Sequence, residues 1–196
     1  VNGSGVDLEA FPPKPLPEEP SFLMVARLVA DKGVREFVAA ARRVRITHPE
    51  ARFRLAGGLD PNPAGITSKE FEAWVDEGVV DYLGPVHPIQ LEIERCRYYV
   101  LPSYREGTPR SVLEAMATGR PVITTNTPGC RETVVPGQNG LLVPPRDAQG
   151  LAEAMIELLE SPQETIERMA AASLALAQEK FDVHAVNQKL LDIMGL

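Results

Sequence analysis

The stretch YYVLPSYREGTPRSVLEAMATGRPVIT, residues 98–124, predicts a strand, a helix and a second strand in direct succession. Residues 98–101 and 121–124 are short apolar runs of the kind found in parallel strands that are covered on both faces. Between them, a helical pattern covers residues 109–118. Strands joined in this way by a helix run parallel, with a right-handed crossover. The stretch therefore predicts a parallel α/β sheet.

The start of the central helix predicts an anion site. Thr108 and Pro109 are a strong start signal, because threonine caps free N–H groups and the fixed φ of proline suits the first helical position. We expect the N–H groups of Arg110 and Ser111, with the positive end of the helix dipole, to point into the crevice beyond the strand ends. A phosphate or another anion would bind there.

The same alternation continues on both sides of this unit. Upstream it predicts strands over 21–26, 51–56 and 79–83 and helices over 32–45, 68–77 and 88–96. Downstream it predicts a helical turn over 131–134, a strand over 140–143 and helices over 148–160, 163–179 and 183–194. This order favours a doubly wound, Rossmann-like parallel sheet, with ligands bound outside the carboxyl ends of the strands.

The length of 196 residues and the 44% hydrophobic composition fit one globular domain, which we expect over 21–180. Residues 1–20 contain glycines and then a proline-rich stretch, which is typical of a linker running into a domain. Residues 181–196 are expected to form a separate C-terminal helix. Because Val1 has no methionine before it, we expect the chain to be cut from a larger protein.

Charge and composition exclude several classes of protein. The 20 basic and 27 acidic residues give a net charge of −7, which argues against a nucleic-acid partner. The sequence has no stretch of about 18 apolar residues and no secretory signal, which favours a cytoplasmic location. Cys96 and Cys130 lack metal-site or redox spacing, so we interpret them as buried thiols and not as a disulfide or a zinc site.

Two carboxylates bracket the predicted helix start. Glu106 lies in the preceding loop, and Glu114 projects roughly 130° away from the apolar face of the helix, so it is not a core residue. Carboxylates accept hydrogen bonds from vicinal hydroxyls, of which a sugar and a ribose each offer a pair. The alternative for Glu114 is a solvated side chain paired with Arg110, four residues earlier.

Two cations follow the first predicted strand. Arg27 lies at its carboxyl end, and Lys32 lies at the start of the next helix, so both would reach the same crevice. A charge-assisted hydrogen bond to phosphate contributes about 1.5 to 3 kcal/mol, enough to oppose the negative net charge. The alternative is that Arg27 caps a strand and Lys32 is a solvated helix residue.

These motifs together carry a resemblance to a known family. Glu106 and Glu114 in an E-x7-E arrangement, with ARL at 26–28 and Lys32-Gly33 upstream, resemble the C-terminal donor domain of the group 1 (GT4) family of retaining GT-B glycosyltransferases. The likeness covers nearly the whole chain. It extends to further segments: NGSGVD at 2–7, LAGG at 55–58, VDYLG at 80–84 and GQNGLLV at 137–143.

The resemblance implies roles for individual residues. The residues implied in catalysis are Arg27 and Lys32, which would bind the donor diphosphate and stabilise the leaving nucleotide, and Glu106, which would contact hydroxyls of the donor sugar. Glu114 would hold the ribose. The remaining donor-binding residues would be Gly107, Thr108, Pro109 and Arg110 beside the sugar or phosphate, and Gly57 and Val86 beside the base. The loop departs from the commoner Glu-Gly-Phe-Gly form, as in relatives that build bacterial surface polysaccharides.

The resemblance also implies the reaction and the partners. Such enzymes transfer a sugar with retention at the anomeric carbon, usually without a metal or another cofactor, because cationic side chains and a helix end replace it. No Asp-x-Asp motif for a metal-bridged phosphate is present in this sequence. The implied donor is a nucleotide sugar, with a UDP-linked hexose or N-acetylhexosamine favoured. The acceptor would bind to a missing N-terminal domain, and the parent protein would associate with the inner face of the membrane.

Other functions are weighed against this one. A dinucleotide-dependent oxidoreductase needs a Gly-x-Gly-x-x-Gly pattern that residues 26–33 lack. Three alternatives remain: a GT-B sugar-nucleotide epimerase, a glycogen-type synthase, and a noncatalytic domain that binds a nucleotide sugar. His48 and His184 are interpreted as ordinary residues, whereas a position near the donor base stays open for His87.

Overall fold

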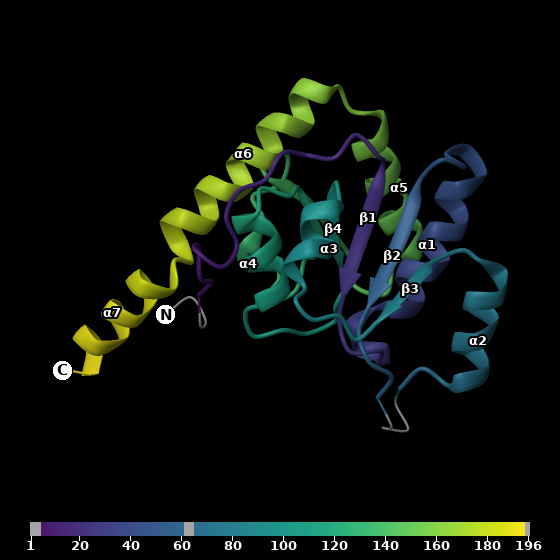
Figure 1. Cartoon of the computed structure of the whole chain (residues 1–196), viewed down its shortest axis with the longest axis horizontal. Coiled ribbons are helices and arrows are strands. Elements are labelled where there is room, and N and C mark those ends of the chain that lie inside the picture. The colour runs from purple at the N-terminus through teal and green to yellow at the C-terminus, as the bar shows by residue number, and fades with distance from the viewer. Residues whose placement is uncertain (1–4, 61–64, 195–196) are drawn as a thin grey trace.

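A computed structural model describes residues 5–60 and 65–194 of the chain, and it contains one sheet of six parallel strands (Figure 1). The strand order is β3-β2-β1-β4-β5-β6, so the predicted doubly wound parallel sheet is confirmed. The strands are β1 (Ser21–Val25), β2 (Arg52–Ala56), β3 (Asp81–Gly84), β4 (Tyr98–Leu101), β5 (Val122–Thr125) and β6 (Gly140–Val143). The order changes direction between β1 and β4, which is where sheets of this type bind ligands.

Helices cover both faces of the sheet (Figure 1). On one face α1 packs against α5, and on the other face α4 packs against α3 and α6. The helices are α1 (Val34–Thr47), α2 (Ser68–Glu77), α3 (Gln90–Arg95), α4 (Arg110–Ala117), α5 (Ala148–Glu160), α6 (Gln163–Lys180) and α7 (Val183–Met194). Two short 3-10 turns, η1 (Ala30–Lys32) and η2 (Arg131–Thr133), complete the elements.

The central helix starts one residue later than predicted. Pro109, with φ −73° and ψ 108°, is the N-cap of α4, and no side chain caps the helix, so the prediction that Thr108 is the cap was wrong. The extended ψ of Pro109 delays the first helical turn by one residue. Val112 and Leu113 then donate to the Pro109 carbonyl.

The helix predicted over 32–45 is interrupted at its start. Gly33 has φ 74° and separates η1 from α1, so Lys32 ends a 3-10 turn and is not part of the α-helix. A β-carbon on Gly33 would lie 2.1 Å from the Pro102 carbonyl oxygen. Glycine is therefore needed here both for its left-handed conformation and for the close approach of the loop after β4.

The expected linker packs on the domain over its described part, and its residues 1–4 lie outside the described residues. The Val6 N–H donates to the Phe181 carbonyl at 2.7 Å, and the Val183 N–H donates to the Val6 carbonyl at 3.0 Å. From this point α7 projects away from the sheet (Figure 1). Val186 is its only buried residue within 183–194, whereas Ile193 and Met194 are exposed.

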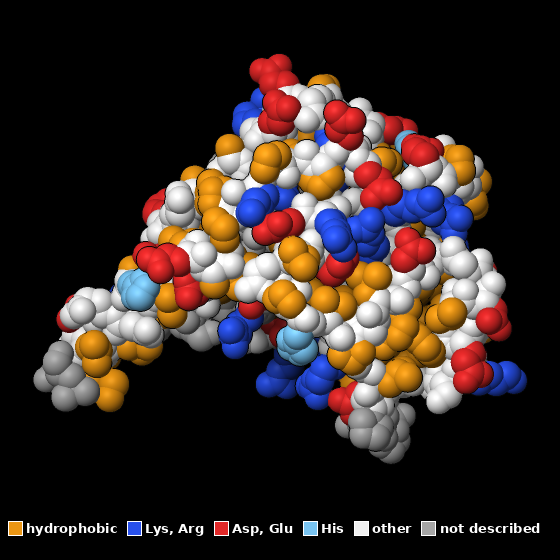
Figure 2. Space-filling model, in the orientation of Figure 1, with side chains coloured by type: hydrophobic (Ala, Val, Ile, Leu, Met, Phe, Trp, Pro, Cys, Tyr) orange, Lys and Arg blue, Asp and Glu red, His pale blue; other side chains and the backbone are white. Residues whose placement is uncertain are grey.

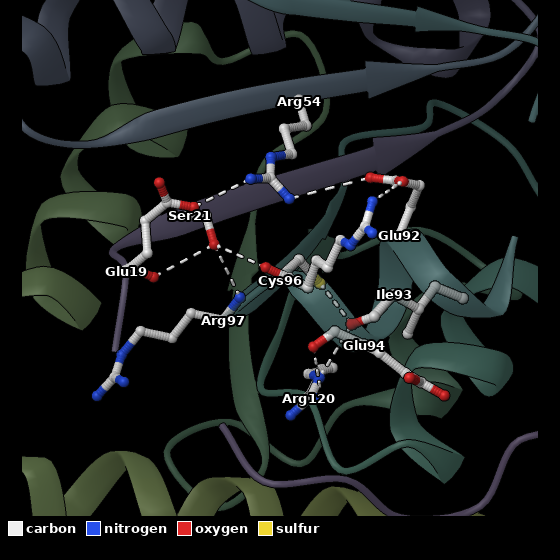
Figure 3. Close-up of polar contacts among 10 residues, drawn as sticks. Glu19, Ser21, Arg54, Glu92, Ile93, Glu94, Cys96, Arg97 and Arg120 are labelled. Atoms are coloured by element: carbon white, nitrogen blue, oxygen red, sulfur yellow. Dashed lines mark hydrogen bonds and ion pairs between the residues drawn. The ribbon is translucent and has the colours of Figure 1, made fainter. Parts of the chain in front are cut away.

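Several arginines, among them Arg54, Arg97 and Arg120, make polar contacts with β1, α3 and the segments before them (Figure 3). Arg120 is fully buried, and its guanidinium donates to the carbonyls of Ile93, Glu94, Lys14 and Pro15 at 3.0 to 3.2 Å. Burial lowers the pKa of this side chain. These bonds tie the proline-rich segment to the last turn of α3, whose carbonyls lie at the negative end of the helix.

Candidate donor-binding site

A cavity of about 740 Å³ opens where the strand order changes direction. Its walls come from the carboxyl ends of β1, β2 and β4, the loop after β3, and the start of α4. In the orientation of Figure 1 the strands point downward, and Figure 2 shows Lys and Arg side chains gathered at this lower side of the domain. The lining residues are Val25, Ala26, Arg27, Lys32, Ala56, Gly57, Gly58, Pro85, Val86, His87, Ile89, Leu101, Glu106, Pro109, Arg110, Ser111 and Glu114.

Lys32 and Glu106 form an ion pair in this wall. Lys32 Nζ lies 2.6 Å from Glu106 Oε1, and their side chains are only 19% and 13% exposed. Backbone contacts bring the two segments together, because the Tyr104 N–H donates to the Asp31 carbonyl at 2.7 Å. The Lys32 ammonium and the Glu106 carboxylate therefore face the cavity as a preformed pair.

A glycine holds the other side of the Glu106 loop. Gly129 has φ 86°, and a β-carbon on it would lie 1.8 Å from the Gly107 carbonyl oxygen and 2.4 Å from that of Glu106. No other residue type fits this approach without displacing the loop. The backbone of the Glu106 loop thus contacts two other segments of the chain, at Asp31 and at Gly129.

Arg27 lies on the rim of the cavity. Its guanidinium is 2.9 Å from Asp60 Oδ2, and its side chain is 72% exposed. The charge is thus accessible to a ligand while a carboxylate holds the side chain. The sequence reasoning missed Asp60, although its position soon after β2 places it at the same edge of the sheet.

The start of α4 contributes both charge signs. Glu114 is only 15% exposed, and its carboxylate lies 4.0 Å from the guanidinium of Arg110, so the predicted spacing does bring this pair together. Burial raises the pKa of Glu114, and the nearby Arg110 opposes that shift. Within the described residues, the N–H groups of Arg110 and Ser111 have no acceptor, which leaves them available to an anion.

The cavity gathers most of the residues singled out in the sequence. Arg27, Lys32, Glu106, Gly57, Val86, Pro109, Arg110 and Glu114 line it, whereas Gly107 and Thr108 do not. Gly107 is exposed beside Gly129, and Thr108 precedes the cap of α4. Pro85, His87 and Ile89 also line the wall, next to the predicted Val86. His87, for which a position near this site was left open, thus lies in the wall, whereas Pro85 and Ile89 were missed, although the end of β3 was a signal that could have found them.

Metal ligands do not cluster in the part of the chain that the structure describes, where no group of three or more His, Cys, Asp or Glu side chains is suitably placed. Cys96 and Cys130 are buried and free, and burial raises the pKa of Cys96 to about 12. Across residues 5–60 and 65–194, no helix is long and apolar enough to cross a membrane.

Comparison with known proteins decides the family. Residues 19–161 match the sequence profile described as "Glycosyl transferases group 1". The chain belongs to this glycosyltransferase family. One relative of this glycosyltransferase chain is the N,N'-diacetylbacillosaminyl-diphospho-undecaprenol alpha-1,3-N-acetylgalactosaminyltransferase of Campylobacter jejuni. It is 35% identical over 176 residues, which are 90% of this chain and 44% of the relative.

Further similarities support the same assignment. The glycogen synthase of Mycobacterium tuberculosis is 33% identical over 93% of this chain and 45% of its own length. The structure of sucrose-phosphate synthase from Thermosynechococcus elongatus superposes with a TM-score of 0.84 at 30% identity, covering 97% of this chain and 50% of that one. The glycosyltransferase chain described here thus spans about half the length of these relatives.

Proposed function

We propose that this chain is the donor-binding half of a retaining glycosyltransferase that uses a nucleotide diphosphate sugar. One observation carries the proposal. The Lys32–Glu106 ion pair, the accessible Arg27 and the largely buried Glu114 surround a single cavity at the start of α4. Cations, carboxylates and free N–H groups are the groups that a diphosphate and two sets of hydroxyls require.

The donor diphosphate would bind between Arg27, Lys32 and the helix start. Arg27 and Lys32 would stabilise the negative charge that develops on the leaving nucleotide, which is the task a metal performs in other transferases. No metal or other cofactor is proposed. A phosphate oxygen would share the Lys32 ammonium with Glu106, while the second oxygen of Glu106 accepts from a sugar hydroxyl. Because the pair is preformed, little reorganisation would accompany the reaction.

Glu114 would accept hydrogen bonds from the ribose, and the base would lie between Gly57 and Val86, beside His87. We favour a UDP-linked hexose or N-acetylhexosamine as the donor. This choice follows the family resemblance, and it agrees with the name of the Campylobacter jejuni N-acetylgalactosaminyltransferase. Synthesis of bacterial surface polysaccharide is the corresponding process.

The acceptor would bind to an N-terminal domain of the same protein. The apolar residues of α7 that face solvent, including Leu191, Ile193 and Met194, would pack on that domain. The whole protein would act in the cytoplasm, at the inner face of the membrane. Its acceptor would be a saccharide or a lipid-linked saccharide.

Calorimetric titration of this chain with UDP, GDP, ADP and their sugar conjugates tests the proposal. Lys32→Ala and Glu114→Ala should each weaken binding of one nucleotide class about 10- to 100-fold, the equivalent of one or two charge-assisted hydrogen bonds. Lys69→Ala and Glu72→Ala change exposed residues of α2 outside the cavity lining, so they should bind like the wild type. Failure of the wild-type chain to bind any of these nucleotides would refute a donor site.

A second candidate follows from the similarity to glycogen synthase. A glycogen-type synthase would use the same donor cavity but extend a polyglucose acceptor. Product analysis of the protein that contains both halves distinguishes the two. A lipid-linked or short saccharide product supports the first proposal, and an extended glucan supports the second.

A further inference from the structure

A side-chain stack lies directly behind the Glu106 loop. Tyr104, two residues before Glu106, has its ring beneath the guanidinium of Arg146, whose carbon lies 4.5 Å from the ring centroid. The Tyr104 hydroxyl donates to Glu36 Oε1 at 2.5 Å. The stack therefore joins three elements: the loop after β4, the loop after β6 and the first turn of α1.

Arg146 adopts an unfavourable backbone conformation in order to reach this ring. Its φ is 62°, and among the described residues it is the only one other than glycine with a positive φ. A β-carbon disfavours this left-handed conformation. Glycine would satisfy the backbone better, so the presence of arginine points to a use for its side chain.

The Tyr104 hydroxyl is held as a donor. Burial, followed by the hydrogen bond to Glu36, raises the pKa of Tyr104 to about 12, so both causes favour the protonated hydroxyl that donates to Glu36. Two cations face the cluster, Arg146 above the ring and Arg35 from the neighbouring position on α1, and Arg35 is itself paired with Glu70 at 2.6 Å. The other carboxylate oxygen of Glu36, Oε2, is buried and has no hydrogen-bond partner among the described residues. The main polar contact of the Glu36 carboxylate is therefore the Tyr104 hydroxyl.

Tyr104 also connects the stack to both partners of the ion pair in the cavity. Its N–H donates to the carbonyl of Asp31, which precedes Lys32, and its own chain continues through Arg105 to Glu106. A shift of the Tyr104 ring would therefore move Glu106 relative to Lys32. The stack is therefore a further contact of this loop, in addition to the contact with Gly129.

We propose that Arg146 is a positioning residue for Glu106, acting through the ring of Tyr104. Without the guanidinium above it, the ring gains freedom, and the Glu106 carboxylate loses its fixed distance to the sugar hydroxyls. This inference rests on the proposed function, in which Glu106 contacts the donor sugar. Arg146 itself is not among the residues that line the cavity.

The variant Arg146→Gly distinguishes a role in positioning Glu106 from a role in stabilising the fold. It removes the contact with the Tyr104 ring, and at the same time it relieves the strain of a left-handed backbone at this position. We expect unfolding in urea to show unchanged or higher stability, since glycine adopts this φ without strain. We expect affinity for the UDP-sugar that binds the wild type best to fall about three- to tenfold, the range of a partly exposed cation–π contact. Affinity for UDP alone should stay within about twofold.

A double-mutant cycle with Glu106→Ala completes the test. If Arg146 acts through Glu106, then Arg146→Gly should weaken UDP-sugar binding in the wild type but have no further effect in Glu106→Ala. Tyr104→Phe keeps the ring beneath the guanidinium and should cause a smaller loss than Arg146→Gly. Equal losses in the wild-type and Glu106→Ala backgrounds, or a loss of stability in Arg146→Gly with no selective loss of UDP-sugar binding, would overturn the inference.

The outcomes distinguish this inference from the proposed function. If the wild-type chain binds UDP-sugar and Glu106→Ala weakens that binding, the proposed function stands, and the behaviour of Arg146→Gly decides the inference alone. If the wild-type chain binds no nucleotide sugar, or if Glu106→Ala has no effect, then the role of Glu106 fails and the inference fails with it.

Discussion

The two ends of the sheet use the same residue types for opposite purposes. At the amino ends, Arg120 is fully buried and its hydrogen bonds go to backbone carbonyls, of which those to Ile93 and Glu94 are drawn in Figure 3. At the carboxyl ends, Arg27 is 72% exposed and Lys32 faces a cavity. The partners of these two cations are carboxylates, which a ligand could share or displace. A cation thus stabilises the fold where its partners are fixed backbone, and is available for binding where its partner is a side chain beside a cavity.

The difference also concerns the cost of burial. A guanidinium loses its hydration on burial, and Arg120 recovers this loss through several carbonyl bonds together, with the charge of Glu94 also favouring its charged form. The pairs at the cavity are partly exposed and so keep part of their hydration. Substitutions at the amino ends should therefore change stability, whereas substitutions at the cavity should change binding.

The largest expected effect on stability is that of Arg120→Leu. Loss of the buried guanidinium removes hydrogen bonds to four carbonyls, those of Ile93, Glu94, Lys14 and Pro15, and leaves a space in its place, so we expect the free energy of unfolding to fall by about 3 to 5 kcal/mol. Urea unfolding followed by circular dichroism measures this change. Arg168→Ala, an exposed arginine on α6, serves as the control, with an expected change within about 0.5 kcal/mol.

A loss of less than about 1 kcal/mol in the free energy of unfolding of Arg120→Leu would contradict the contrast between the two ends of the sheet. The carbonyls would then find other hydrogen-bond donors, such as water. The contrast would be sharpened by nucleotide titrations of the variant under conditions where it is folded. We expect unchanged affinity there, because Arg120 lies away from the cavity.

Much of this architecture follows from local sequence. The bounds of α2, β4, β6, α5 and α7 agree with the prediction, because apolar runs and helical periods fix where such elements begin and end. The carboxylates and cations of the cavity could be placed at one edge of the sheet for the same reason: parallel strands end on the same side.

What the sequence could not show depends on contacts between distant segments. Gly33 divides a predicted helix because the Pro102 carbonyl approaches it, and nothing local signals that approach. Arg120 follows a helix and resembles an exposed terminal charge, yet it is buried under the proline-rich segment. The pairing of Lys32 with Glu106 joins residues 74 positions apart, so spacing alone placed both at the cavity without showing the bond.

The next expected effect is a pH dependence at Glu114. Burial raises its pKa in the folded protein, so the folded state holds the proton more strongly than the unfolded chain does. Protonated Glu114 therefore contributes to the free energy of unfolding at a pH below the ordinary pKa of a glutamate. This contribution is lost as the pH rises through the raised pKa of Glu114 in the folded protein. We therefore expect Glu114→Gln to become more stable than the wild type as pH rises from about 4 to 7, measured by urea unfolding across that range.

Binding should respond to pH in the opposite direction. If Glu114 holds the ribose as proposed, its ionised carboxylate is the better acceptor for the hydroxyls, so affinity for the UDP-sugar should increase over the same range more in the wild type than in Glu114→Gln. Glu70 provides the contrast within the domain, because its hydrogen bond with Arg35 lowers its pKa. Its stabilising contribution is present at neutral pH and is lost on acidification. A Glu114→Gln variant whose stability relative to wild type did not change with pH would contradict the assignment of an unfavourably buried charge.

The smallest expected effect is that of Glu19→Gln in the network at the amino ends of the strands. Glu19 Oε2 lies 3.0 Å from the guanidinium of Arg54, and its side chain is about half exposed. Arg54 keeps a second carboxylate, that of Glu92, at 3.9 Å (Figure 3). Half-exposed pairs of this kind contribute about 0.2 to 1 kcal/mol, so we expect a loss in that range at low salt.

Salt dependence tests why this effect is small. Because counter-ions screen an exposed pair, the difference between Glu19→Gln and wild type should shrink toward zero at about 1 M salt. The loss in Arg120→Leu should persist at that salt concentration, since its carbonyl bonds are shielded from solvent. If salt reduced both losses equally, the buried contacts of Arg120 would be no better shielded than the exposed pair of Arg54 and Glu19. Burial would then not explain why the two arginines stabilise the fold to different extents.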